Sequence, residues 1–368
     1  MTRPRGPLPV LLLAAFGTFT GLLILESVAR VMAVREERRE GRLDRDLSKL
    51  AGPGPGSLAT LGQMIHKSEN PRIVYELRPR LDVVFAGGRV TTSDAGHRGL
   101  DVSRPKPGST FRIVGIGDSY MFGQGVSDEE TYLARLAEPG NDFLFGRRLE
   151  TVNLAVPGFN TAMEVEMLRE RGAALEPDLV LIEIVGNDLD LPNFLWSAVD
   201  PWTPRRSFLL DFVRSRLGAA AISKESAAGL SEAPHEFEAA NQTYARDAER
   251  VPDAYRSLVG LDAFRTALRD LAEFGRAHGV PVLALTHGVW FEDEMLAALR
   301  SNGIPVLVLR SALRQRARQM GAPDYGRSPL AMSATDLHPS ATGHQAIAEE
   351  LAAWLKAALQ EPARQKGS

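Results

Sequence analysis

The stretch FRIVGIGDS, residues 111–119, is an apolar run that breaks on glycine and ends on a serine. Short, mainly apolar runs of this kind are typical of strands buried in a parallel sheet. The same arrangement, an apolar run followed by small and polar residues, recurs at residues 152–161 (VNLAVPGFNT) and 179–188 (LVLIEIVGND). A fourth polar cluster, DLHPS, occupies residues 336–340. Because loops at the carboxyl ends of parallel strands gather into one crevice, we expect these clusters to meet.

The chain between and after these clusters alternates between strand-like and helix-like patterns. Further strands are predicted at Val282–Leu285 and Ile304–Leu309, each preceded by a helical stretch that ends near a glycine. This alternation predicts an α/β fold in which a parallel sheet lies between two layers of helices. A serine, a glycine amide, an asparagine and an Asp/His pair at one edge of such a sheet are the parts of a serine hydrolase.

Three helix starts are indicated by local patterns. Ser127 to Glu130 and Thr161 to Glu164 both match the capping box that begins a helix. The last helix follows Pro339 and is expected to continue to about Leu359.

The order and spelling of the four clusters resemble the SGNH (GDSL-type) hydrolase superfamily, in particular its membrane-anchored bacterial members. The resemblance extends from about Phe111 to about Leu355, and it implies the flavodoxin-like three-layer α/β/α fold, action on ester bonds and no cofactor or metal. Carried over position by position, it implies these site residues: Ser119 as nucleophile, Gly158 and Asn187 as oxyanion-hole donors beside the N–H of Ser119, His338 as base and Asp336 as the acid that orients it.

The sequence departs from the family pattern at two positions. The third cluster usually carries a glycine two residues before its asparagine, but here Val185 precedes Asn187 at that distance. The last cluster usually places its acid three residues before the histidine, where this chain has Thr335. Asp336, two residues before His338, reaches the imidazole only if the chain turns between them, because an extended strand would carry the carboxylate too far along.

Other polar residues close to these clusters are not expected to take part in the reaction. Asp118 and Asp188 are expected to support their loops without joining the chemistry. His287 also ends a predicted strand and is the rival base, but His338 is favoured because an adjacent acid can set its tautomer. A dinuclear metallophosphoesterase would need several histidine ligands, and the cluster at Asn187 and Asp188 carries none.

The composition limits the remaining classes of function. At 368 residues, with 44% hydrophobic and 24% charged residues, the chain suits one large globular domain with appendages. A net charge of −3 gives no reason to expect nucleic acid as a partner. The absence of cysteine excludes disulfides, thiol catalysis and cysteine-based zinc sites.

Residues 6–25 are 20 residues without a charge, which is about the length that spans a bilayer. A cleaved signal peptide, for which Ser27-Val28-Ala29 offers a site, and a buried helix are the alternatives. We predict an uncleaved single anchor. Arginines flank the span on both sides, and because a long domain translocates largely regardless of charge, the domain is expected outside the cytoplasm, on the periplasmic or outer face.

The predicted domains are an anchor over residues 1–33, a juxtamembrane helix, linker and strand-rich lead-in over 34–110, a hydrolase domain over 111–360 and a tail over 361–368. An insertion at about 190–253 interrupts the strand–helix rhythm. It directly follows the Asn187 cluster, so we expect it to cover the crevice. Trp196 and Trp202 are candidates for lining an acyl or sugar pocket, and a simple packing role is the alternative.

The sequence therefore predicts a serine esterase that cleaves an O-acyl ester of a small molecule, polysaccharide or lipid through an acyl-enzyme. Two alternatives stay open. One is an O-acyltransferase that acts on envelope polysaccharide with the same residues, and the other is a non-catalytic carbohydrate-binding relative.

Overall fold

The computed structural model describes residues 8–47, 53–138, 143–144, 146–196, 207–210, 212–213, 237–239, 251, 253–288 and 293–365. The chain forms two compact units. One comprises residues 1–50 and 197–227, and the other comprises residues 51–196 and 228–368.

The larger unit is built on a six-stranded sheet of order β13-β12-β9-β6-β8-β7. Five of its strands are parallel and β7 pairs antiparallel at one edge. The strands are β6 (Thr110–Ile116), β7 (Phe143–Leu144), β8 (Arg147–Asn153), β9 (Leu179–Glu183), β12 (Val282–Thr286) and β13 (Val306–Val308). Every residue of the two central strands β6 and β9 is buried. The predicted α/β class with a parallel sheet is confirmed.

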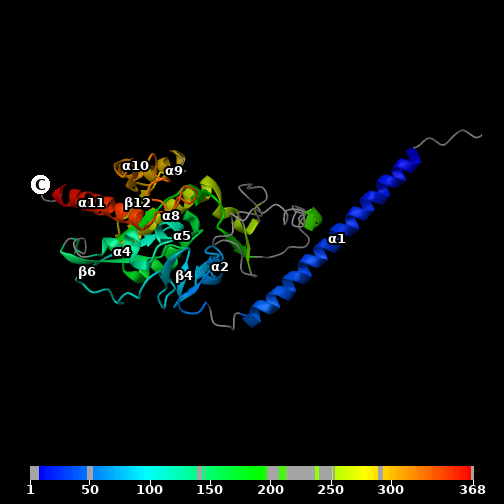
Figure 1. Ribbon diagram of the computed structural model, residues 1–368, viewed down its shortest axis with the longest axis horizontal. Coiled ribbons are helices and arrows are strands. Elements are labelled where there is room, and N and C mark those ends of the chain that lie inside the picture. The colour runs from blue at the N-terminus through cyan, green and yellow to red at the C-terminus, as the bar shows by residue number, and fades with distance from the viewer. Residues whose placement is uncertain are drawn as a thin grey trace, which may run out of the picture. The chain divides into compact units, whose positions relative to one another are not determined.

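Helices cover the sheet in two groups. The connection from β6 to β8 runs toward one edge of the sheet, whereas the connections from β8 through β9 and β12 to β13 run toward the other edge. Because such connections are right-handed, the helices of the two sets lie on opposite faces of the sheet. Helix α5 packs on α8 and α8 on α9, while α4 packs on α11 and α11 on α10 (Figure 1). The helices are α3 (Ser119–Phe122), α4 (Tyr132–Leu136), α5 (Thr161–Met167), α8 (Gly260–His278), α9 (Asp293–Ser301), α10 (Arg310–Gln319) and α11 (Ala341–Gln365).

Short helical turns complete the connections. They are the 3-10 helices η1 (Asp128–Glu130), η3 (Ala173–Leu175), η4 (Gly186–Leu189) and η6 (Asp253–Leu258), and the π-helix η2 (Leu168–Gly172). The capping box at Ser127 is present and opens η1. The box predicted at Thr161 is wrong by one residue, because Asn160 is the cap and its side chain accepts from the N–H of Met163. The last helix also continues six residues past its predicted end, to Gln365.

The strand-rich lead-in belongs to the same hydrophobic core as the sheet. Its elements are β1 (Ser57–Leu58), α2 (Leu61–Met64), β2 (Ile65–Lys67), β3 (Tyr75–Leu77), β4 (Asp82–Phe85) and β5 (Gly88–Thr91). Leu61, Met64 and Tyr75 are fully buried within that core. The lead-in also touches the sheet backbone, since the N–H of Arg98 donates to the carbonyl of Asn153 at the end of β8.

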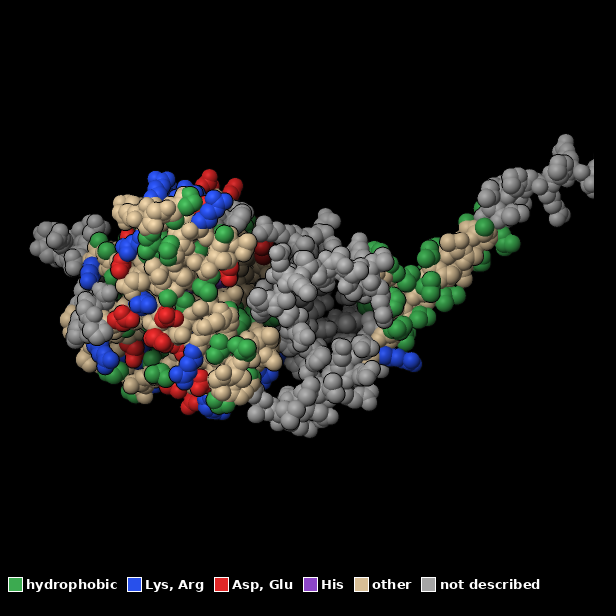
Figure 2. All heavy atoms as spheres, viewed as in Figure 1, with side chains coloured by type: hydrophobic (Ala, Val, Ile, Leu, Met, Phe, Trp, Pro, Cys, Tyr) green, Lys and Arg blue, Asp and Glu red, His purple; other side chains and the backbone are tan. Residues whose placement is uncertain are grey.

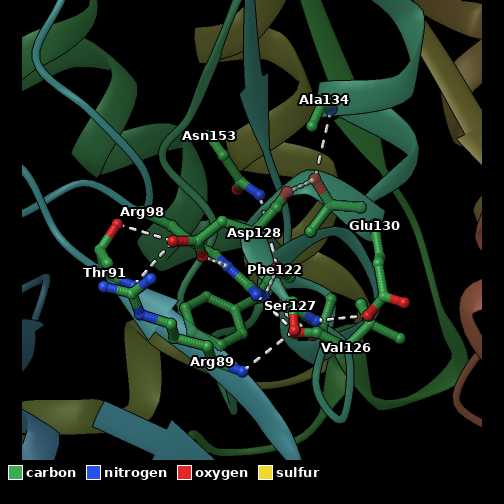
Figure 3. Close-up of polar contacts among 12 residues, drawn as sticks. Arg89, Thr91, Arg98, Phe122, Val126, Ser127, Asp128, Glu130, Ala134 and Asn153 are labelled. Atoms are coloured by element: carbon green, nitrogen blue, oxygen red, sulfur yellow. Dashed lines mark hydrogen bonds and ion pairs between the residues drawn. The ribbon is translucent and has the colours of Figure 1, made fainter. Parts of the chain in front are cut away.

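The Arg98 side chain links the lead-in to the loop after α3 (Figure 3). Its guanidinium is buried, forms an ion pair with Asp128 at 2.8 Å and donates to the carbonyls of Phe122, Gly123 and Val126. It also stacks on the Phe122 ring, 4.5 Å from the centroid. Asp128 in turn accepts from the N–H and hydroxyl of Thr91 on β5. One lead-in arginine therefore fixes residues 122–128, which directly follow the α3 helix.

The smaller unit contains α1 (Leu8–Leu47), whose segment Leu12–Met32 is long and apolar enough to cross a membrane. Its hydrophobic side chains are exposed along the helix (Figure 2). A signal sequence would have the same length and composition.

The predicted insertion contributes one short antiparallel pair, β10 (Phe194–Trp196) with β11 (Phe237–Ala239). Most of residues 190–253, Trp202 included, lie outside the described residues.

Replacing Arg98 by alanine should lower the free energy of unfolding by about 3–5 kcal/mol, because Asp128 loses its buried partner and three carbonyls lose a donor. Arg89→Ala is the matched control from β5, since its side chain forms only an exposed pair with Asp82; it should leave stability nearly unchanged. Urea unfolding measures both. Equal effects of the two substitutions would contradict the role assigned to Arg98.

Candidate active site

Ser119 is the first residue of α3 and follows the end of β6 after the two residues Gly117 and Asp118. Gly117 makes the turn possible, because a Cβ there would lie 2.8 Å from the Cβ of Met121 and 3.3 Å from that of Glu183. Asp118 caps the helix, with Oδ1 accepting from the N–H of Tyr120 at 3.0 Å. The sequence GIGDS thus ends a buried strand and presents the serine at a capped helix start.

The loop before α11 carries Asp336 and His338, and it brings both to Ser119. The Ser119 Oγ lies 2.8 Å from Nε2 of His338, and Nδ1 of His338 lies 2.6 Å from Oδ1 of Asp336. An ionised carboxylate only accepts hydrogen bonds, so Nδ1 carries the proton and Nε2 accepts from the serine hydroxyl. The three side chains form one hydrogen-bonded chain.

The turn that the unusual acid spacing requires is present. Oδ1 of Asp336 also accepts from the backbone N–H of His338 at 3.1 Å, which closes a local turn around Leu337. The N–H of Ser333 donates to the carbonyl of Asp336, and the N–H of Met332 donates to the carbonyl of His338. The hydrogen bond to His338 lowers the pKa of Asp336, so the acid is ionised at neutral pH.

Two backbone N–H groups near the serine have no hydrogen-bond acceptor among the described residues, those of Ser119 and Gly158. Gly158 has φ +78°, and a Cβ there would overlap the side chain of Asn193, with 2.3 Å to Nδ2. Tyr75 of the lead-in supports this turn by donating its hydroxyl to the carbonyl of Pro157 at 3.0 Å. The position therefore requires glycine.

Asn187 lies in η4 after β9 and reaches the nucleophile loop. Its Nδ2 donates to Oδ2 of Asp118 at 3.0 Å. The η4 turn is fixed by Asp188, whose Oδ2 accepts from the N–H of Val185 at 2.6 Å. Asp118 thus contacts the Asn187 loop, and Asp188 holds its own turn; that the two aspartates only support the site stays a prediction.

A group of buried carboxyls underlies the site, and two of them escaped the sequence analysis. Glu183 ends β9, with Oε2 accepting from the Tyr132 hydroxyl at 2.6 Å. Glu164 of α5 is 1% exposed, and neither of its oxygens has a hydrogen-bond partner among the described residues. Burial raises the pKa of Glu164 well above its usual value, and Asp188, Asp118 and Glu183 reinforce the effect. Burial likewise raises the pKa of Asp118 and, strongly, that of Asp188.

The rival base His287 is placed differently. It is 2% exposed, its Nε2 lies 2.6 Å from Oε1 of Glu183, and its ring packs edge-on against Tyr120 at 5.0 Å. Tyr120 in turn packs on His338 at 4.7 Å between ring centroids. Of the two histidines, only His338 makes a hydrogen bond to Ser119 within the described part of the chain, and the Ser119 hydroxyl also lies 3.4 Å from Oδ2 of Asp118. The ring of Tyr120 contacts both histidines and so lies between His287 and the Ser119–His338 pair.

The fold and these contacts place a serine, a histidine and an aspartate in one hydrogen-bonded chain at the carboxyl edge of a parallel sheet. Residues 116–346 match the GDSL-like lipase/acylhydrolase family, so the chain belongs to that family of ester-hydrolysing enzymes. The match begins inside β6, and the lead-in with Arg98 precedes it.

Several solved structures resemble the chain. A lipolytic protein of the G-D-S-L family from Desulfitobacterium hafniense, described as putative, is 14% identical, with 66% of this chain and 97% of that chain covered and a TM-score of 0.38. The psychrotrophic esterase EstA from Pseudoalteromonas is 12% identical, with 68% and 98% covered and a TM-score of 0.40. The lipase/acylhydrolase from Enterococcus faecalis is 15% identical, with 67% and 96% covered and a TM-score of 0.37. No curated protein matches the sequence.

The pKa of Glu164 is raised in the folded protein, so this carboxyl keeps its proton at pH values where the unfolded chain releases it, which is above about pH 4.3. The contribution of Glu164 therefore lowers the free energy of unfolding increasingly as the pH rises from there. Glu164→Gln should therefore stabilise the protein more at pH 8 than at pH 5, as measured by urea unfolding. Glu166→Gln is the control on the same helix, since that carboxylate is paired with Arg72. A Glu164→Gln effect that is constant across this pH range would contradict the assignment.

Proposed function

We propose that the protein is a serine esterase that cleaves an O-acyl ester through an acyl-enzyme on Ser119. The observation that carries this proposal is the continuous hydrogen-bonded chain from Asp336 through His338 to Ser119, with distances of 2.6 and 2.8 Å. Serine is a weak nucleophile until a positioned base removes its proton, and this chain supplies that base together with the acid that holds its tautomer.

The reaction follows from these positions. Nε2 of His338 takes the proton as Oγ of Ser119 attacks the ester carbonyl, and Asp336 stabilises the imidazolium that forms. The imidazolium then gives the proton to the departing alcohol oxygen as the C–O bond breaks. Water attacks the acyl-enzyme by the same route, which releases the acid and frees Ser119.

Three donors are proposed for the oxyanion, the N–H groups of Ser119 and Gly158 and the side-chain amide of Asn187. The two backbone N–H groups have no acceptor among the described residues. The substrate carbonyl oxygen, on which negative charge develops, would be their acceptor. One N–H of the Asn187 amide donates to Asp118, which fixes the plane of the amide and leaves the second N–H for substrate. Such pre-positioned donors are each worth about 10²–10³ in rate.

We further propose that α1 anchors the chain in a membrane through Leu12–Met32 and that the hydrolase domain lies outside the cytoplasm. A long helix with exposed apolar side chains along this segment is the support. The ester would then belong to a small molecule, polysaccharide or lipid that is accessible at the cell envelope.

Substitutions in the triad test the proposal on a small p-nitrophenyl ester. Ser119→Ala and His338→Ala should remove nearly all of the catalysed rate, and Asp336→Asn should lower kcat by roughly 10⁴ because the imidazole loses its tautomer control. Thr335→Ala is the control, since it alters the position where relatives carry their acid and leaves the Asp336–His338 contact intact. A loss of less than about tenfold in Asp336→Asn, with His338→Ala inactive, would reduce the triad to a Ser–His dyad.

A further inference from the structure

A cavity lies at the carboxyl ends of β12 and β13, beside the proposed triad. Its volume is about 490 Å³. His287 at the end of β12 and Leu337, which stands between Asp336 and His338, both line it. The loop that holds the base therefore forms one wall of this cavity, and the Tyr120 ring, in contact with both His287 and His338, connects the two places.

The charge of the cavity is strongly positive for a chain whose net charge is −3. Three arginines line it, Arg310, Arg314 and Arg327, against one carboxylate, Asp324. Asp324 pairs with Arg327 at 3.7 Å. Arg310 and Arg314 have no hydrogen bond or ion pair with any described residue, whereas Arg316 on the same helix pairs with Glu349 at 2.7 Å.

The two unpaired arginines occupy positions that are unfavourable without an anion. Both lie in the first five residues of α10, where the helix dipole disfavours cations, and the first turn contains no acidic residue. They are four residues apart on one helix, so they also repel each other. A bound anion would reverse both effects, because it would neutralise the pair and face the N-terminal end of the helix.

The histidine in the cavity wall gives an independent indication of a ligand. His287 is 2% exposed, and its Nδ1 has no hydrogen-bond partner among the described residues. Buried polar atoms usually have a partner, since leaving one without costs free energy. Its Nε2 lies 2.6 Å from Oε1 of Glu183, but these two atoms are not aligned as a hydrogen bond, so both nitrogens of this cavity-lining ring are unsatisfied among the described residues.

We propose that this cavity is a substrate subsite for an anionic group, so that the preferred substrate is an ester whose acyl or alcohol part carries a carboxylate, sulfate or phosphate. Arg310 and Arg314 bind the anion, and the ester bond extends from there to Ser119. This inference rests on the proposed esterase function and adds the class of substrate to it.

Matched ester pairs test the subsite and show which part of the substrate carries the charge. 4-Acetoxybenzoate against 4-acetoxybenzamide places the charge on the alcohol part, and mono-p-nitrophenyl adipate against p-nitrophenyl hexanoate places it on the acyl part. The protein should prefer the anionic member of one pair by about tenfold to a hundredfold in kcat/KM, as expected for hydrogen bonds to a charged group. The Arg310→Ala/Arg314→Ala double variant should lose this preference and keep its rate on the neutral esters.

Arg318→Ala is the control, because Arg318 is an exposed arginine of α10, as Arg310 and Arg314 are, but lies outside the cavity lining. If neither anionic ester is preferred, or if Arg318→Ala loses the preference as fully as the double variant does, the inference is overturned.

Sulfate binding tests the anion subsite independently of the proposed esterase activity. Ser119→Ala protein should bind sulfate saturably in calorimetry at constant ionic strength, and binding should vanish in the background of the Arg310/Arg314 double variant. Sulfate binding without Ser119-dependent hydrolysis would overturn the esterase proposal and leave the subsite. Hydrolysis with no anion preference and no sulfate binding would overturn the subsite alone.

Discussion

The buried carboxyl of Asp118 connects three parts of the site at the carboxyl edge of the sheet. It caps α3 through the N–H of Tyr120, accepts from the side chain of Asn187 on the neighbouring strand's loop, and directly precedes Ser119. The cap bond goes to the N–H of Tyr120, and the first N–H of the helix, that of Ser119, has no acceptor among the described residues. The position of the proposed nucleophile and of two oxyanion donors thus depends on one carboxyl.

The burial of this carboxyl has an energetic cost that the surrounding structure offsets. Asp118 lies with Glu164, Glu183 and Asp188 in the interior, and mutual repulsion adds to desolvation in raising the pKa of several of them. Such destabilised groups persist where neighbouring structure fixes them. The lead-in supplies part of that support. Arg98 donates hydrogen bonds to carbonyls within residues 122–128, and Tyr75 donates to the carbonyl of the residue before Gly158. Both lie outside the residues that match the family.

Much of the fold and of the candidate site could be predicted from the sequence because the sequence patterns that indicate them are local. Mainly apolar runs that stop at Gly117 and Gly186 indicate the two central strands, and the alternation of strand and helix indicates a parallel sheet. Asp336 is the most informative of the assigned residues, because the turn that its spacing requires is present in the contact with the N–H of His338. Its role in catalysis is still a proposal.

Other features could not be predicted because they arise from contacts between distant segments. Glu183 was visible as a single acid in an apolar strand, but its partners Tyr132 and His287 come from elsewhere in the chain. Nothing in the sequence around Arg98 indicates that its side chain reaches three carbonyls more than twenty residues later in the chain. The helix start at Asn160 was missed by one residue because threonine and asparagine are both common caps.

The central claim is that Ser119 is the nucleophile, and covalent labelling tests it most directly. The folded protein would be treated with a fluorophosphonate and digested, and the modified peptide would be located by mass spectrometry. The account predicts a single adduct on Ser119 that is absent from Ser119→Ala and from His338→Ala. An adduct on a different serine, or no adduct on the folded protein, would contradict it.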